Sequence, residues 1–122
     1  MAMLNNATGF KEIYIVCGRT DLRSGIDRLA TLIKTKCGNE TFQPDVLYLF
    51  CGRRADRIKG LVWEEDGFLL LIKRLSDSRF IWPRNEDDVK RLTQQQFEWL
   101  MAGLTITPKQ SVKKVAPPEY VL

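Results

Sequence analysis

The sequence predicts an α+β domain, in which an antiparallel β-meander of about five strands packs with two helices, plus an extended C-terminal tail. Short runs of apolar and β-branched residues, bounded by turn residues, fill the middle of the chain. Apolar residues at helical spacing precede these runs, and a helix-capping pattern follows them. The 122-residue chain is long enough to bury a core, so we expect a single globular domain over residues 1–104 and a tail over residues 105–122.

The first strand and the first helix are expected near the N-terminus. Residues 12–18 alternate in the manner of a half-buried strand. The segment 22–37 places six apolar side chains on one helical face, namely Leu22, Ile26, Leu29, Ala30, Ile33 and Cys37. Thr20 or Ser24 is a suitable N-terminal cap for this helix, and Gly38 is suited to end it.

The meander is expected to follow this helix. Its strands are predicted at residues 46–50, 57–65, 68–75 and 79–83, with a short edge strand at 89–92. The Asp66-Gly67 dipeptide is typical of a two-residue hairpin turn. A two-residue turn at this point would place Lys59 opposite Arg74 on the neighbouring strand.

A second helix is predicted after the sheet. Thr93 and Gln96 form a capping-box pattern that opens a helix running to about Leu104. One stripe of this helix is apolar and consists of Phe97, Leu100, Met101 and Leu104. Trp99 points away from that stripe, so either the tail covers it or it contacts a partner. The strand at 68–75 is apolar on both faces, and its second face requires cover from this helix or from a partner subunit.

Charges are sorted by sign along the predicted sheet. Glu64, Glu65 and Asp66 lie together at one end. Cations gather at the other end, namely Arg53, Arg54, Arg57, Lys59, Lys73, Arg74 and Arg79, with Arg19 and Arg23 at the start of the first helix. Arginine side chains are forked donors that match phosphate groups, so these nine residues are our candidate nucleic-acid-binding set. The alternative is a solvated loop in which Asp56 neutralises a neighbouring arginine.

Composition favours a non-catalytic protein without a metal or another cofactor. The chain has no histidine, and its three cysteines form no C-x-x-C pair, which argues against a zinc site. The carboxylates at 64–66 are consecutive at a hairpin tip, so they would diverge instead of holding metal ions together. Unpaired cysteines and the lack of a long apolar run predict a cytoplasmic location with no membrane partner. The net charge of +4 permits a polyanionic partner but does not require one.

Most of the chain, about residues 13–104, resembles a known family. The segments "TDLRSGIDRLATLI", "LYLFCGRRADRIKGLVWEEDGFLLLIKRLSDSRFIWP" and "LTQQQFEWLMAGL" carry the resemblance. They are similar to the accessory protein of insertion-sequence elements of type sixty-six, the product of the second open reading frame, labelled TnpB. The chain departs from the family pattern at Cys51, where a basic or polar residue is more frequent, and at Gly60, where a larger apolar residue is usual.

The resemblance implies a protein that is encoded beside a larger transposase and needed with it for transposition. Two roles remain open for it. It could be a DNA-binding accessory that uses the basic end of the sheet, or an assembly module that binds the transposase through apolar faces without contacting DNA. The transposase of the same element and DNA are the expected partners, and a homodimer is left open. We expect Trp99 and Tyr120 to contact a partner, because the tail ends in the apolar and aromatic sequence "PPEYVL".

Overall fold

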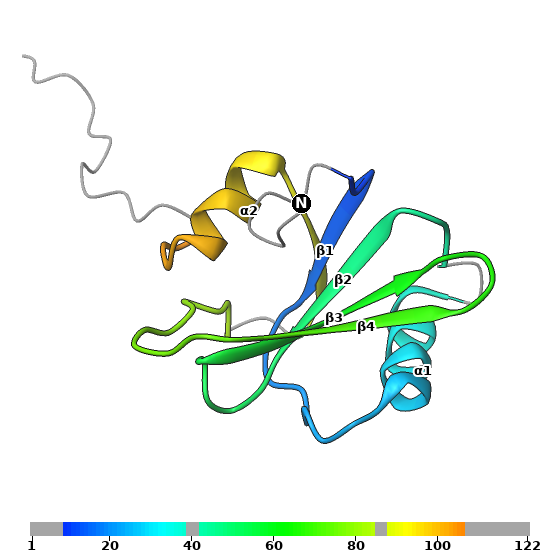
Figure 1. Ribbon diagram of the computed structural model, residues 1–122, viewed down its shortest axis with the longest axis horizontal. Helices are drawn as coiled ribbons and strands as arrows, with labels where there is room; N and C mark the ends of the chain where they lie inside the picture. Colours follow the sequence, from blue (N-terminus) through cyan, green and yellow to red (C-terminus); the bar gives the residue numbers. More distant parts are fainter. Residues whose placement is uncertain (1–8, 39–41, 85–87, 107–122) are drawn as a thin grey trace, which may run out of the picture.

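A five-stranded mixed sheet with one helix on each face forms the core of the protein (Figure 1). The computed structural model describes residues 9–38, 42–84 and 88–106. The elements are β1 (Glu12–Val16), α1 (Ile26–Cys37), β2 (Val46–Cys51), β3 (Arg57–Trp63), β4 (Phe68–Arg74), β5 (Val89–Leu92) and α2 (Gln94–Met101). The strand order across the sheet is β4-β3-β2-β1-β5. The predicted α+β class is confirmed.

The sheet combines a meander with a crossover. Strands β2, β3 and β4 form the predicted antiparallel meander. Strand β1 instead runs parallel to β2, because the chain between them passes through α1 on one face of the sheet. Strand β5 then pairs antiparallel with the outer side of β1, so the sheet as a whole is mixed.

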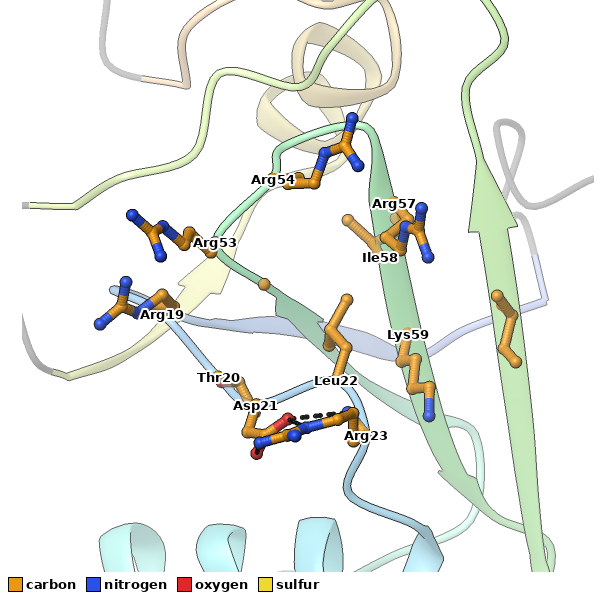
Figure 2. A pocket seen from close by; sticks show the side chains of 12 residues that line it. Arg19, Thr20, Asp21, Leu22, Arg23, Arg53, Arg54, Arg57, Ile58 and Lys59 are labelled. Atoms are coloured by element: carbon orange, nitrogen blue, oxygen red, sulfur yellow. Dashed lines mark hydrogen bonds and ion pairs between the residues drawn. The ribbon is translucent and has the colours of Figure 1, made fainter.

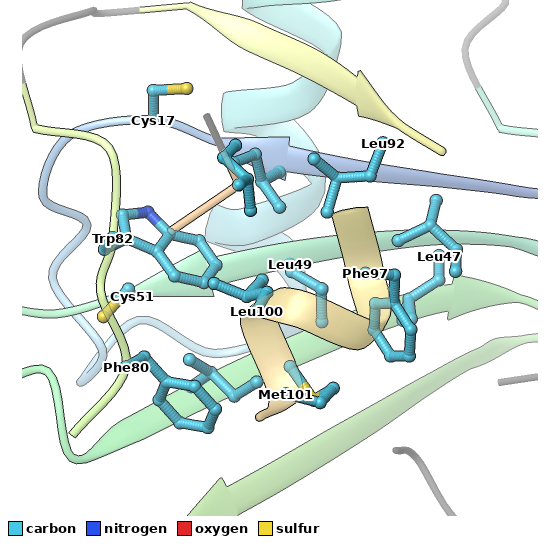
Figure 3. Close-up of a cluster of buried hydrophobic side chains, with 14 of the residues drawn as sticks. Cys17, Leu47, Leu49, Cys51, Phe80, Trp82, Leu92, Phe97, Leu100 and Met101 are labelled. Atoms are coloured by element: carbon cyan, nitrogen blue, oxygen red, sulfur yellow. The ribbon is translucent and has the colours of Figure 1, made fainter. Parts of the chain in front are cut away.

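Both faces of the sheet are covered, and each has its own hydrophobic cluster. On one face, Leu29, Ala30 and Ile33 of α1 pack against strand residues that include Tyr48 and Phe50. On the other face, α2 buries side chains against β2, as Figure 3 shows for Phe97, Leu100, Met101, Leu47 and Leu49. Every residue of the central strand β2 is buried as a result. The strand that was expected to need cover on both faces, β4, is covered only in part, because Leu69 and Ile72 remain exposed.

The hairpin between β3 and β4 differs from the prediction. Its last pair is Trp63 with Phe68, so four residues form the loop, and the amide of Glu64 donates to the Gly67 carbonyl oxygen at 2.8 Å. Glu65 takes the left-handed conformation with φ of 72°, whereas Gly67 does not. The two-residue turn at Asp66-Gly67 was therefore a wrong prediction.

The register changes with the loop. Lys59 lies opposite Ile72 and not opposite Arg74, as was predicted. Arg57 takes the place opposite Arg74. Lys73 lies opposite Ile58, whose side chain belongs to the cluster under α2, so Lys73 is on the opposite face of the sheet from Lys59.

The predicted strand at 79–83 is also wrong. This segment forms no strand, although Phe80 and Trp82 are buried and alternate with the exposed Ile81. Isolated hydrogen bonds hold it in place of a strand ladder. The amide of Phe80 donates to the Ala55 carbonyl oxygen, the Trp82 indole donates to the Val16 carbonyl oxygen, and the Pro83 carbonyl oxygen accepts from the Gly18 amide. The residues at 89–92, expected as a short edge, supply the fifth strand.

The helix ends show two confirmed caps and two errors. Gly38 ends α1 as predicted, with φ of 99° and its amide donating to the Lys34 carbonyl oxygen at 2.8 Å. The capping box of α2 is confirmed, because the amide of Gln96 donates to Thr93 Oγ1 and the amide of Thr93 donates to Gln96 Oε1. Helix α2 ends at Met101, however, and Leu104 is exposed.

Helix α1 begins at Ile26 and has no side-chain cap, so neither Thr20 nor Ser24 has the capping role that was predicted. Thr20 instead lies in a loop that packs against the end of β2. Cys37, which was expected on the buried face, is the last residue of the helix and is exposed.

Candidate nucleic-acid interface

A depression of about 880 Å³ opens at one end of the sheet, on the side of α1 (Figure 2). Besides Ile72 of β4, three segments line it: the loop between β1 and α1, the loop between β2 and β3, and β3 itself. Each segment contributes two cations, and the full set is Arg19, Arg23, Arg53, Arg54, Arg57 and Lys59. We call this depression the basic cleft.

Close packing between the two loops gives the basic cleft its shape. The amide of Thr20 donates to the Cys51 carbonyl oxygen at 2.9 Å, which fixes the first loop to the end of β2. Gly52 allows this approach, because a Cβ atom at that position would lie only 3.0 Å from Cγ of Leu22. The loops that carry Arg19 and Arg53 are thus held side by side.

A further arginine, Arg84, connects the same two loops. Its guanidinium donates to the carbonyl oxygen of Gly18 at 3.1 Å and to that of Gly52 at 2.7 Å. The same group lies 3.7 Å from the Cys51 sulfur. Sequence reasoning did not identify Arg84 as part of the site. Its place directly after Trp82 and Pro83 was the available signal in the sequence, and that signal does not specify which backbone Arg84 would contact.

Two of the cleft cations have carboxylate neighbours. Asp21 accepts two hydrogen bonds of 3.0 Å from the Arg23 guanidinium, and this pairing lowers the pKa of Asp21 to about 2. The carboxylate is therefore ionised at neutral pH and offsets the charge of Arg23. The Arg57 Nε atom lies 3.5 Å from Asp56 Oδ1. Asp56 thus neutralises a neighbouring arginine, as the alternative of a solvated loop expected.

The remaining cleft cations have no carboxylate partner within the described residues. Lys59 Nζ donates to an uncharged partner, the Ser24 carbonyl oxygen, at 3.2 Å. Arg19, Arg53 and Arg54 form no ion pair within that part of the chain, and all three are exposed. The lining thus carries six cations and one carboxylate.

The other candidate residues lie outside the basic cleft. Arg74 lies opposite Arg57 on the same face but does not line the depression. Lys73 is on the opposite face, where burial lowers its pKa, and Arg79 is exposed beyond the end of β4. Trp99 is partly exposed on α2, and Tyr120 lies outside the described residues. The structure thus brings six of the nine predicted cations together in one depression.

The chemistry of the basic cleft is that of an anion site. Its cations are mostly arginines, which present forked donors to phosphate oxygens. Leu22, Ile58 and Ile72 form the apolar part of the lining. Within residues 9–38, 42–84 and 88–106, no cluster of three histidine, cysteine or acidic side chains is placed to hold a metal ion.

Comparison with known proteins identifies the family. Residues 11–111 match the family model described as "IS66 Orf2 like protein". The chain belongs to the IS66 Orf2-like family. This family has an accessory role in transposition and is associated with the transposition machinery of IS66 elements; it is not a known catalytic family. No helix among the residues that the structure describes is long and apolar enough to cross a membrane.

Two similar proteins come from Sinorhizobium fredii (strain NBRC 101917 / NGR234). The uncharacterized protein y4jC is 27% identical over 105 residues, which cover 86% of this chain and 88% of that protein. The uncharacterized protein y4hO is 29% identical over 94 residues, which cover 76% of this chain and 80% of that protein. No solved structure matches the chain.

Proposed function

We propose that this IS66 Orf2-like protein binds DNA phosphates through the basic cleft and cooperates with the transposase of its element without catalysing a reaction itself. The main support is the convergence of six cations from three segments on one depression that contains a single carboxylate. That carboxylate, Asp21, is already paired with Arg23. An excess of unpaired positive charge in a concave site attracts polyanions and concentrates them there.

The arrangement of like charges also supports an anionic ligand. Arg57 and Arg74 lie directly opposite one another on adjacent strands. Facing like charges destabilise a strand pair by up to roughly 1 kcal/mol. A phosphate group near this pair would offset that cost, and DNA supplies phosphates at regular spacing.

The proposed contacts are to the DNA backbone, with little reading of bases. Base recognition in the major groove usually requires a helix or ribbon that presents polar side chains to base edges. Helix α2 contains no lysine or arginine, and α1 has the acidic Asp27 in its first turn. The cleft cations lie instead on two loops and a strand, where they suit phosphate contacts that position a duplex.

Mobility-shift titration tests this function with two duplexes, one from an end of the element and one of unrelated sequence. We expect both duplexes to shift with similar affinity and both shifts to weaken as salt rises. If neither duplex shifts at low salt, the protein does not bind DNA directly. A shift of the element end alone would instead require base recognition.

The second candidate function is an assembly module that binds the transposase without DNA contact. Its support is exposed apolar surface: Leu69, Ile72, Ile81 and Leu104 are between 38% and 66% exposed. Pull-down of the transposase in nuclease-treated extract separates the two functions. If binding to the transposase remains when Arg53, Arg54 and Arg57 are replaced by alanine, the transposase contact is independent of the basic cleft.

A further inference from the structure

The two edges of the sheet differ in how well they are protected from pairing with another strand. Edge strands leave a row of backbone groups unpaired, and natural proteins usually protect them by short length or by charged side chains. Strand β5 has four residues, two of which are Lys90 and Arg91. Strand β4 has seven residues, and its first five, 68–72, are all apolar. The β4 edge thus lacks both forms of protection over most of its length.

The apolar side chains of β4 are also poorly covered. Ile72 is 66% exposed and Leu69 is 38% exposed, although they lie on opposite faces of the sheet. Among the described residues, the sheet ends at β4, and no strand pairs with its outer side. An exposed, apolar edge of this length is a pairing surface.

The charges near β4 indicate which strand would pair with it. The hairpin that leads into β4 carries three exposed acidic residues, Glu64, Glu65 and Asp66. The other end of β4 carries Lys73 and Arg74. A second copy that runs antiparallel to β4 would bring its acidic tip to the basic end of the first copy, and the reverse contact would occur at the other end.

We propose that two copies of this protein form a homodimer by antiparallel pairing of their β4 strands about a two-fold axis at Leu71. All seven residues of β4 then pair, and the two five-stranded sheets become one continuous sheet. Leu71 faces the second copy's Leu71, Leu70 faces the second copy's Ile72, and Phe68 faces the second copy's Arg74. The apolar centres of the two strands therefore lie against each other, and the pairing covers both Ile72 residues.

This register brings opposite charges within electrostatic reach. Asp66 of one copy lies two residues beyond the pair that joins its Phe68 to the second copy's Arg74. Two residues span about 7 Å along a strand, which is shorter than the Debye length of about 10 Å at 0.1 M salt. The acidic tip of each copy would thus offset the repulsion between Arg57 and Arg74 in the other copy.

The dimer would also determine how two DNA-binding sites are arranged, a consequence that rests on the proposed DNA binding. Residues directly opposite each other in an antiparallel pair share a face of the sheet. The two basic clefts would therefore lie on the same face of the continuous sheet. Such a dimer could engage two segments of DNA at once, which would strengthen binding through multivalency.

Light scattering coupled to size-exclusion chromatography tests the dimer without DNA, so its result is independent of the proposed DNA binding. We expect a mass of twice the 14.1 kDa chain and a smaller mass on dilution. Ile72→Lys places a charge on the exposed edge and should shift the protein to the monomer with unchanged circular dichroism. A wild-type monomer at every concentration, or an Ile72→Lys variant that dimerises as the wild type does, would overturn the proposal.

Position-specific crosslinking tests the register in a Cys37→Ser background, where both remaining cysteines are buried. Leu71→Cys should form a disulfide between copies under mild oxidation, because opposed Cα atoms lie about 4.5–5.5 Å apart. Leu69→Cys is the matched control on the same face: four residues, or about 13 Å, would separate the two copies of this cysteine along the strand. Equal crosslinking at both positions would contradict the register.

A truncation distinguishes the second copy from another occupant of this edge. Removal of residues 107–122 should leave the dimer intact if β4 pairs with β4. Loss of the dimer in the truncated chain would show that the tail supplies the contact, and the proposal would be wrong.

Discussion

Removal of Asp21, the one carboxylate among the described residues that line the basic cleft, should strengthen DNA binding. Asp21 holds the Arg23 guanidinium through two hydrogen bonds of 3.0 Å, so Asp21→Asn would release this arginine for phosphate contact. The substitution also removes one negative charge from the lining. A change of pH cannot replace this experiment, because the pKa of Asp21 is about 2 and the carboxylate is charged at neutral pH. Its pairing contributes to stability above pH 3.8 and loses that contribution only as the pH falls through about 2.

The size of the effect follows from the number of available cations. Six cations line the cleft; Arg23 is paired with Asp21 and Arg57 with Asp56, which leaves four. Each phosphate contact contributes about −0.9 to the slope of log affinity against log salt, so the wild-type slope should be about −3.6 and the Asp21→Asn slope about −4.5. The affinity advantage of the variant should therefore grow by a factor of about 8 for each tenfold reduction in salt.

Fluorescence anisotropy with a labelled duplex at several salt concentrations measures these slopes. Asp27→Asn is the matched control, because it removes the same charge from a residue that does not line the basic cleft. It should raise affinity slightly without changing the slope. An Asp21→Asn protein with the wild-type slope, or with weaker binding, would refute the role assigned to Arg23.

Two further predictions concern the fold itself. Thr93→Ala removes the cap of α2 and should lower the free energy of unfolding by about 1 kcal/mol in urea titration; Thr93→Ser should retain most of the stability, and equal loss in both variants would contradict the capping role. A thiol reagent should label only Cys37 quickly in the native protein and all three cysteines in denaturant, because Cys17 and Cys51 are buried whereas Cys37 is exposed. Rapid labelling of a second thiol in the native state would contradict this packing.

Local sequence patterns predicted the elements better than their pairing. The runs that form β2, β3 and β4, the apolar face of α1 and the capping box of α2 were all recognisable. The hairpin register was not, because the Asp66-Gly67 dipeptide suggested a short turn while Glu65 adopted the left-handed conformation in a longer one. A loop longer by two residues moves every cross-strand pair, which is why Arg57 and not Lys59 faces Arg74.

The extended segment at 79–83 shows a second limit of pattern reading. Buried Phe80 and Trp82 alternate with exposed Ile81, as in a strand. The pattern predicts that alternate side chains are buried, but it does not predict the partners of the backbone hydrogen bonds. Here they go to a loop and not to a neighbouring strand.

The sequence predicted most of the cations of the candidate site, but it did not predict which of them line one depression or that Arg84 holds its loops together. The concentration of arginines in one loop identified the basic end of the sheet, and six of the nine selected cations line the basic cleft. Lys73 lies on the opposite face from Lys59 and Arg74 because side chains alternate along a strand, and grouping residues by charge alone ignored that alternation. Arg84 acts through backbone contacts between distant segments, which no local pattern specifies.

The salt dependence of DNA binding by a triple arginine variant tests the basic cleft most directly. Replacement of Arg53, Arg54 and Arg57 by alanine leaves two of the four available cations, Arg19 and Lys59, so the slope should fall from about −3.6 to about −1.8. A control with alanine at Lys11, Lys90 and Arg91, near the opposite edge of the sheet, removes the same charge and should keep the wild-type slope. An unchanged slope in the cleft variant, or an equal change in both variants, would show that DNA does not bind in the basic cleft.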